Sequence, residues 1–164
     1  IVLGRRASFP VVVVGCGRLG SALLNYREFE KEGIRVVAGF DKDPARVARD
    51  ATPPVLPVDE LRDFVKDHEI EVGIIAVPDE AASEVFDTMI GAGVRGFLNF
   101  TTVQLKCAGR CERENCTRQC TVDNVNFGLE IENLFYMITF QKPENQVLSL
   151  EELKEKHHRD LGTA

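Results

Sequence analysis

Short apolar runs alternate along this chain with longer segments in which apolar residues recur at helical spacing. Runs of aliphatic and β-branched residues are typical of strands buried on both faces of a sheet, whereas helical spacing is typical of helices packed on such a sheet. The predicted strands lie at residues 11–14, 34–40, 71–77 and 96–100, and the predicted helices at 19–26, 44–50, 59–68 and 82–90. This alternation predicts an α/β fold with a doubly wound, mostly parallel sheet.

A late segment, residues 129–138, is apolar on more than one side of its predicted helix, and Asn126 is placed to cap it. An apolar surface of this width predicts burial against something other than the helix's own sheet. A second helix is expected in the charged tail, residues 141–164, where Ser149 and Glu152 have the spacing of a capping box.

The bulk composition of the chain narrows its class. The 164 residues carry a formal net charge of −6, and 44% of them are apolar, which fits one globular domain. The negative charge disfavours direct binding of this chain to a nucleic-acid backbone. No apolar run approaches the roughly 20 residues of a membrane span, and no signal peptide is recognisable. We therefore expect a cytoplasmic protein without a membrane partner.

A glycine-rich turn follows the first predicted strand and opens the first predicted helix. In this context the pattern G-x-G-x-x-G is typical of dinucleotide binding in a Rossmann-like sheet. The first glycine permits a tight turn, the second lets a pyrophosphate approach the backbone, and the third allows close packing of helix on strand. The candidate pyrophosphate-binding residues are Gly15, Cys16, Gly17, Arg18, Leu19 and Gly20.

An acidic residue, Asp41, ends the second predicted strand about 20 residues beyond the last glycine. A carboxylate at this place accepts hydrogen bonds from the adenosine ribose and repels a 2′-phosphate. Lys42 partly offsets that charge and Asp43 restores it, so we predict NAD(H) rather than NADP(H). The carboxyl ends of the later strands are expected to supply the remaining cofactor contacts, from Lys42, Val77, Pro78, Asn99, Phe100 and Thr101.

Catalytic groups are missing from the ends of the predicted strands. A dehydrogenase needs an acid–base group such as His, Lys or Tyr beside the nicotinamide. The histidines are His68, His157 and His158, and none of them follows a predicted strand. Cofactor binding without such a group favours a sensing domain over an enzyme. The alternatives are the cofactor domain of an NAD-dependent oxidoreductase and a CoA-binding domain.

Five sequence blocks occur in an order that closely resembles the NADH-binding domain of the Rex redox-sensing transcriptional repressors. The likeness runs over residues 8–140, in the blocks VVVVGCGRLGSALLNY, VAGFDKDP, VGIIAVPDEAA, GVRGFLNFTTVQL and VDNVNF. It implies that residues 10–140 form an NAD(H)-binding Rossmann domain. It also implies that residues 1–9 are the end of a linker from a winged-helix DNA-binding domain.

The resemblance to Rex implies a mode of action as well. The protein would be a homodimer in which the late helix swaps onto the partner, and Phe127 would approach the nicotinamide of the neighbouring subunit. NADH binding would rotate the subunits and release operator DNA. Two positions depart from the family pattern. Asn126 stands where an Asp often pairs with the position of Tyr26 to report the redox state, and Thr102 stands where Pro is usual.

Four cysteines lie in a segment, residues 106–121, that is longer than the matching Rex segment. They are Cys107, Cys111, Cys116 and Cys120, in the spacing C-x3-C-x4-C-x3-C. On helical turns this spacing gives two pairs of thiolates, which would form a tetrahedral site for zinc or for an iron–sulfur cluster. A reversible dithiol pair and an inert loop are the alternatives. Cys16, inside the glycine turn, is interpreted as a small filler residue.

Overall fold

The computed structural model of this chain describes residues 8–106 and 120–140. They belong to two compact units that divide between Val125 and Asn126, and each unit is described by itself. The start of the expected linker, the expected tail helix within residues 141–164 and three of the four clustered cysteines lie outside the described residues.

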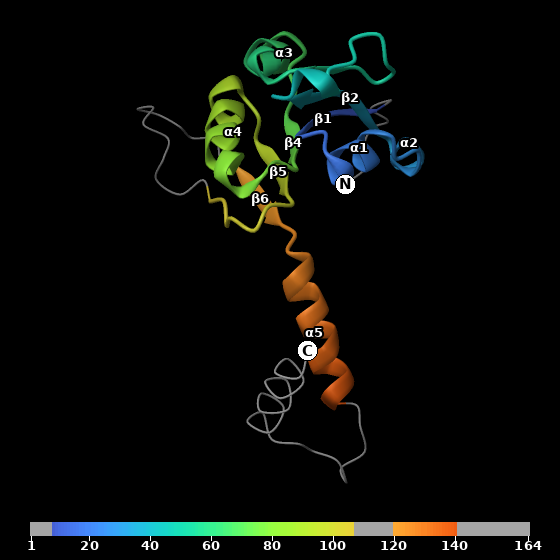
Figure 1. The fold of residues 1–164 in the computed structure, drawn as a ribbon, viewed down its shortest axis with the longest axis vertical. Helices are drawn as coiled ribbons and strands as arrows, with labels where there is room; N and C mark the ends of the chain where they lie inside the picture. The colour runs from blue at the N-terminus through green and yellow to red at the C-terminus, as the bar shows by residue number, and fades with distance from the viewer. Residues whose placement is uncertain (1–7, 107–119, 141–164) are drawn as a thin grey trace, which may run out of the picture. The chain divides into compact units, whose positions relative to one another are not determined.

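A six-stranded sheet forms the first unit, and every pair of neighbouring strands in it is parallel (Figure 1). The strands are β1 (Phe9–Val14), β2 (Ile34–Asp41), β3 (Val55–Pro57), β4 (Val72–Ile75), β5 (Gly96–Asn99) and β6 (Thr121–Asn124). Their order across the sheet is β3-β2-β1-β4-β5-β6. The chain winds outward in both directions from β1, which confirms the doubly wound sheet and places its switch point between β1 and β4.

Helices cover both faces of the sheet, as the run of valines in β1 predicts. They are α1 (Arg18–Leu24), α2 (Glu28–Lys31), α3 (Leu61–Asp67) and α4 (Asp79–Ala92), with α1 and α2 on one side and α3 and α4 on the other (Figure 1). Val12 and Val14 belong to an apolar core that also holds side chains from α3 and α4. Val11 and Val13 belong to a second core with Leu24 of α1. Successive residues of β1 are thus buried on opposite faces.

Three short elements differ from the sequence-based expectation. The helix expected at residues 44–50 was wrong, because a 3-10 turn, η1 (Pro44–Arg46), forms there and Ala48 then pairs with Val55 in antiparallel fashion. The strands β3 and β6 were not predicted. β3 has three residues and follows two prolines, and β6 has four residues that are mostly exposed, so neither carries a recognisable strand pattern.

The second unit contains one described helix, α5 (Phe127–Phe140). Asn126 caps it as predicted, because its side-chain oxygen accepts the N–H of Leu129 at 3.2 Å and its carbonyl accepts the N–H of Glu130 at 3.0 Å. The large apolar side chains of α5 are 50% to 68% exposed in the single chain. No helix within residues 8–106 and 120–140 combines the length and the apolar character that a bilayer span requires.

Candidate functional site

A cavity of about 690 Å³ opens at the carboxyl edge of the sheet, where β1, β2 and β4 end. Its inner wall includes many of the predicted cofactor-binding residues: Gly15, Gly17, Arg18, Leu19, Asp41, Lys42, Val77 and Pro78. Its outer wall comes from the 3-10 turn η2 (Val58–Glu60), from α3 and from α4, through Val58, Asp59, Leu61, Arg62, Ala81, Glu84, Val85 and Thr88. The cavity therefore lies at the switch point, where doubly wound sheets bind their ligands.

The glycine turn is fixed by close contacts on both of its sides. Gly15 has a φ of +92°, and its N–H donates to the carbonyl of Phe40 at 2.8 Å. A Cβ at Gly15 would clash with the carbonyl of Ala76, and one at Gly20 would clash with the carbonyl of Gly15. Gly17 differs, because a Cβ there would meet no atom within 4 Å. The backbone at Gly17 is thus open to a phosphate, while the other two glycines permit the turn itself.

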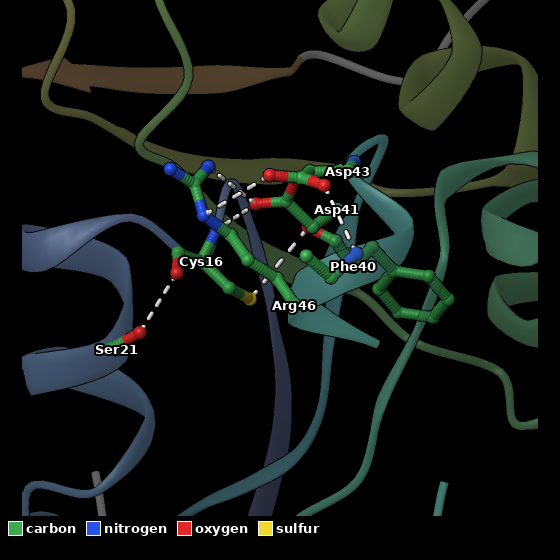
Figure 2. A network of polar contacts seen from close by, with 7 residues as sticks. Cys16, Ser21, Phe40, Asp41, Asp43 and Arg46 are labelled. Atoms are coloured by element: carbon green, nitrogen blue, oxygen red, sulfur yellow. Dashed lines mark hydrogen bonds and ion pairs between the residues drawn. The ribbon is translucent and has the colours of Figure 1, made fainter. Parts of the chain in front are cut away.

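The carboxylate of Asp41 is fixed beside this turn by donors from its own chain (Figure 2). One oxygen accepts the N–H of Asp43 at 2.8 Å. The other accepts the N–H of Cys16 at 2.8 Å and Nη1 of Arg46 at 3.4 Å. Burial raises the pKa of Asp41, but these donors more than offset it, so the pKa lies below its ordinary value. The group is charged at neutral pH and lies on the cavity wall, where it can accept ribose hydroxyls.

Cys16 lies within the turn, and its side chain is buried. Its Sγ lies 3.7 Å from the carbonyl of Phe40, and a Cβ at Gly39 would lie 2.6 Å from that sulfur. Burial and the charge of Asp41 raise the pKa of the thiol to about 11. The backbone of Cys16 links the turn to β2 and to α1. Its N–H donates to Asp41 at the end of β2, and its carbonyl accepts the hydroxyl of Ser21 in α1 at 2.8 Å (Figure 2). This environment favours the filler interpretation and a neutral thiol.

The residues predicted at the end of β5 and just after it do not line the described cavity wall. Asn99 is fully buried, and its amide nitrogen donates to the carbonyl of Val103 at 2.7 Å and to Oδ1 of Asn124 at 2.8 Å. Its oxygen accepts the N–H of Thr101 at 3.0 Å and the hydroxyl of Thr101 at 2.8 Å. These bonds use every hydrogen-bonding position of the amide, so Asn99 holds the segment after β5 in shape. Contacts of Asn99, Phe100 and Thr101 with a cofactor stay a prediction.

The carboxylate of Asp79, at the start of α4, also holds the segment that follows β5. Asp79 accepts the hydroxyl of Thr102 and also accepts its N–H at 3.0 Å. These two bonds lower the pKa of the Asp79 carboxyl. A proline at position 102, which is usual in the Rex pattern, has no N–H and no hydroxyl to donate. The departure at Thr102 therefore adds a contact between the segment after β5 and α4.

Sequence reasoning missed Arg46 and the polar groups of the α3–α4 wall. Arg46 lines the cavity and pairs with Asp41, although it follows that residue on a short turn without any periodic pattern. Arg62, Glu84 and Thr88 reach the cavity from two different helices. Their approach depends on how α3 packs beside α4, which no local pattern encodes.

Two predicted features are not part of the described cavity wall. Of the clustered cysteines, Cys120 is described, whereas Cys107, Cys111 and Cys116 lie outside the described residues. Within residues 8–106 and 120–140, no group of three or more His, Cys, Asp or Glu side chains is arranged to hold a metal ion. The zinc or iron–sulfur site stays a prediction. Phe127 begins α5 in the second unit, and its contact with a nicotinamide also stays a prediction.

The sequence profile of the CoA binding domain family matches residues 8–103, which include the glycine turn and Asp41. The chain belongs to this CoA-binding domain family. Curated relatives of the chain are named redox-sensing transcriptional repressors of the Rex type. The chain is 37% identical over 123 residues to Rex 1 of Thermotoga maritima, covering 74% of this chain and 59% of that protein. It is 38% identical over 131 residues to Rex of Desulforamulus reducens, covering 79% and 62%.

Solved structures that resemble this chain also belong to Rex-family repressors. A Rex-family repressor, RSP, crystallised with β-NAD+ and operator DNA, superposes with a TM-score of 0.70 at 25% identity, over 96% of this chain and 63% of that one. Another RSP structure, with a TM-score of 0.68 at 22% identity, shares the fold. The resemblance to Rex and the Rossmann-like fold are thereby confirmed. The chain spans about three fifths of the length of the curated relatives described above.

Proposed function

We propose that this chain is the NAD(H)-binding, redox-sensing region of a Rex-type transcriptional repressor. The observation that carries the proposal is one cavity in which an open glycine turn lies beside the charged carboxylate of Asp41. The relatives support it, since they are named redox-sensing repressors and a related structure holds NAD+ and operator DNA. NADH binding changes the geometry of a homodimer and releases operator DNA, which a winged-helix domain binds in the cytoplasm.

The proposed binding mode follows the order of the residues along the cavity. The backbone at Gly17 and Arg18 faces the diphosphate, and Asp41 accepts the hydroxyls of the adenosine ribose. The nicotinamide half extends past Val77 and Pro78 toward the segment after β5. In the homodimer, Phe127 of the second subunit completes that end.

We infer that the domain senses its cofactor and does not turn it over. The residues that line the described cavity include no His, Tyr or Cys. The lysine among them, Lys42, directly follows Asp41 and so lies at the adenosine end of the proposed mode. A His or Tyr of the kind that commonly transfers the proton is therefore not found on the described wall, although the carboxylates of Asp59 and Glu84 line it. An oxidoreductase domain, the competing hypothesis, would turn over simple hydroxy acids or aldehydes.

The homodimer is proposed from the apolar surface of α5. A single helix that keeps large apolar side chains half exposed on several sides is typical of an element covered by another chain. Swapping of α5 between subunits would provide that cover. The four-cysteine segment, residues 106–121, would add a second redox input if it holds zinc, an iron–sulfur cluster or a reversible dithiol.

CoA is the second candidate ligand, because the matching family is named for it. CoA carries a phosphate on the 3′ position of its ribose, and a buried carboxylate at Asp41 repels such a group. NADH has a free diol at the same place. The electrostatics of this cavity thus favour NADH over CoA.

Isothermal titration calorimetry on the full chain tests the proposal with NADH, NAD+ and CoA as ligands. We expect saturable binding of NADH, tighter than that of CoA. Absence of NADH binding, or tighter binding of CoA, would overturn the proposed function. The variant Asp41→Ala should weaken the binding of NADH by about 1–3 kcal/mol, because it removes a charged hydrogen-bond acceptor. Asp67→Ala, an exposed position at the end of α3, serves as the matched control with unchanged affinity.

A further inference from the structure

Arg46 is a cavity residue to which the proposed binding mode gives no role. It ends the η1 turn, its side chain is 50% exposed, and it lines the cavity. Its Nη1 lies 3.4 Å from Oδ2 of Asp41, and its Nε lies 4.0 Å from Oδ2 of Asp43. Asp43 is itself held in place, because its other oxygen accepts the N–H of Ala45 at 3.0 Å. Two carboxylates therefore hold one guanidinium at the adenosine end of the cavity (Figure 2).

We propose that Arg46 is a specificity-determining residue: it is the cationic half of a 2′-phosphate site that Asp41 keeps closed. The inference rests on the proposed function, since it concerns which adenosine ribose the cavity accepts. With Asp41 present, its carboxylate occupies the place beside Arg46 and repels a phosphate. The ribose with a free diol is then the one that fits.

The contacts of Asp41 show why a single side chain controls this choice. Its two oxygens accept hydrogen bonds from three donors: the N–H groups of Cys16 and Asp43, and the guanidinium of Arg46. Removal of the carboxylate leaves all three donors facing the same small volume. A phosphate group suits such a set of donors, because a guanidinium and backbone N–H groups can together give its oxygens charge-assisted hydrogen bonds.

Other basic residues of the cavity are less well placed for this role. Arg18 belongs to the glycine turn, where the diphosphate is proposed to bind, and Arg62 approaches from α3. Lys42 lines the cavity next to Asp41 and is the strongest competitor. Arg46 differs from these residues because an ion pair already joins it to the oxygen of Asp41 that must leave.

The test compares two nucleotides that differ only in the 2′-phosphate, adenosine 5′-monophosphate and adenosine 2′,5′-bisphosphate. Their affinities are measured by calorimetry on the full chain. The wild-type chain should prefer the monophosphate. In Asp41→Ser the ratio of the two affinities should shift toward the bisphosphate by about tenfold or more, the value of a charge-assisted hydrogen bond. The double variant Asp41→Ser/Arg46→Ala should lose that shift.

Arg49 provides the matched control, because it is an exposed arginine paired with Glu60 and is not on the described cavity wall. The double variant Asp41→Ser/Arg49→Ala should keep the shift. Absence of a shift in Asp41→Ser overturns the inference. So does a shift that survives removal of Arg46, which would assign the phosphate to Lys42.

A second variant keeps the inference testable if Asp41→Ser does not fold by circular dichroism. Asp43→Asn retains an acceptor for the N–H of Ala45 but removes one of the two charges on Arg46. It should shift the ratio in the same direction by about threefold, the scale of an exposed ion pair. No shift overturns the inference. Binding of NADH to the wild-type chain tests the proposed function separately, so a chain that binds NADH without these shifts loses the inference alone.

Discussion

Asp41 uses the same two oxygens for the fold and for the proposed ligand. In the free chain they accept N–H groups from Cys16 and Asp43, which ties the end of β2 to the glycine turn. A carboxylate offers about four acceptor positions, so ribose hydroxyls can be added while these backbone bonds persist. Stability and the proposed cofactor binding therefore both involve the charge of this one side chain.

The charge of Asp41 predicts a loss of stability in acid. Its pKa in the folded chain lies below the ordinary value, about 3.9 in peptides. The stability that it contributes is therefore present above about pH 4 and is lost as the pH falls through the folded pKa. We expect the free energy of unfolding to differ between wild type and Asp41→Asn by a constant amount from about pH 5 to pH 7, and by less below about pH 4. Urea titrations at each pH measure it, and a difference that does not shrink as the pH falls below about 4 contradicts the prediction.

The raised pKa of Cys16 predicts a thiol that resists alkylation. Burial and the negative charge of Asp41 keep it protonated at neutral pH, and the thiolate is the reactive form. In the folded chain, we expect iodoacetamide to leave the peptide that contains Cys16 unmodified at about pH 7.5, well below that pKa. Peptide mapping by mass spectrometry reads the result, and the same chain unfolded in urea is the control. Equal labelling of folded and unfolded chains would show that this thiol is accessible.

In the glycine turn, one glycine is proposed to serve binding and another serves folding. Gly17→Ala places its new methyl group in open space, whereas Gly20→Ala places one against the carbonyl of Gly15. We expect Gly17→Ala to keep the wild-type melting temperature and to lose about tenfold or more in NADH affinity, because the methyl group blocks the diphosphate. Gly20→Ala should lower the free energy of unfolding by about 1–3 kcal/mol through overpacking. Thermal melts and calorimetry on both variants separate the two effects, and a Gly17→Ala variant that binds NADH normally would contradict the diphosphate position.

The elements that the sequence predicts well are those whose burial is visible locally. β1 is buried on both faces and its sequence is a run of valines, and the apolar residues of α4 recur at helical spacing. The η1 turn and β3 carry no such local pattern: Ala48, after the turn, pairs with Val55, and β3 holds its place through pairing with β2. β6 is mostly exposed and holds its place through pairing with β5. Pairing partners that lie outside the element itself decide such elements.

For the whole molecule, α5 predicts an association between chains. Phe135 is 68% exposed, and the other large apolar side chains that the structure describes on the same helix are at least half exposed. If a second subunit covers this surface, Phe135→Asp should turn a dimer into a monomer, because it buries an unpaired charge in the interface. Glu132→Gln, on the same helix, is the control and should remain dimeric. Sedimentation equilibrium measures both, and a wild-type chain that is monomeric at micromolar concentration contradicts the dimer.

The sequence by itself determined the class of fold, the glycine turn and the acid at the end of β2, because each of these is written in residues close together in the chain. Tertiary structure alone decided that Asp41 lies within hydrogen-bond distance of the N–H of Cys16, that Arg46 pairs with Asp41 and that Asn99 is used up inside the fold. It also decided that α3 and α4 form the outer wall of the cavity. The physical reason is that these contacts join residues whose meeting depends on strand order and helix packing, which local periodicity does not encode.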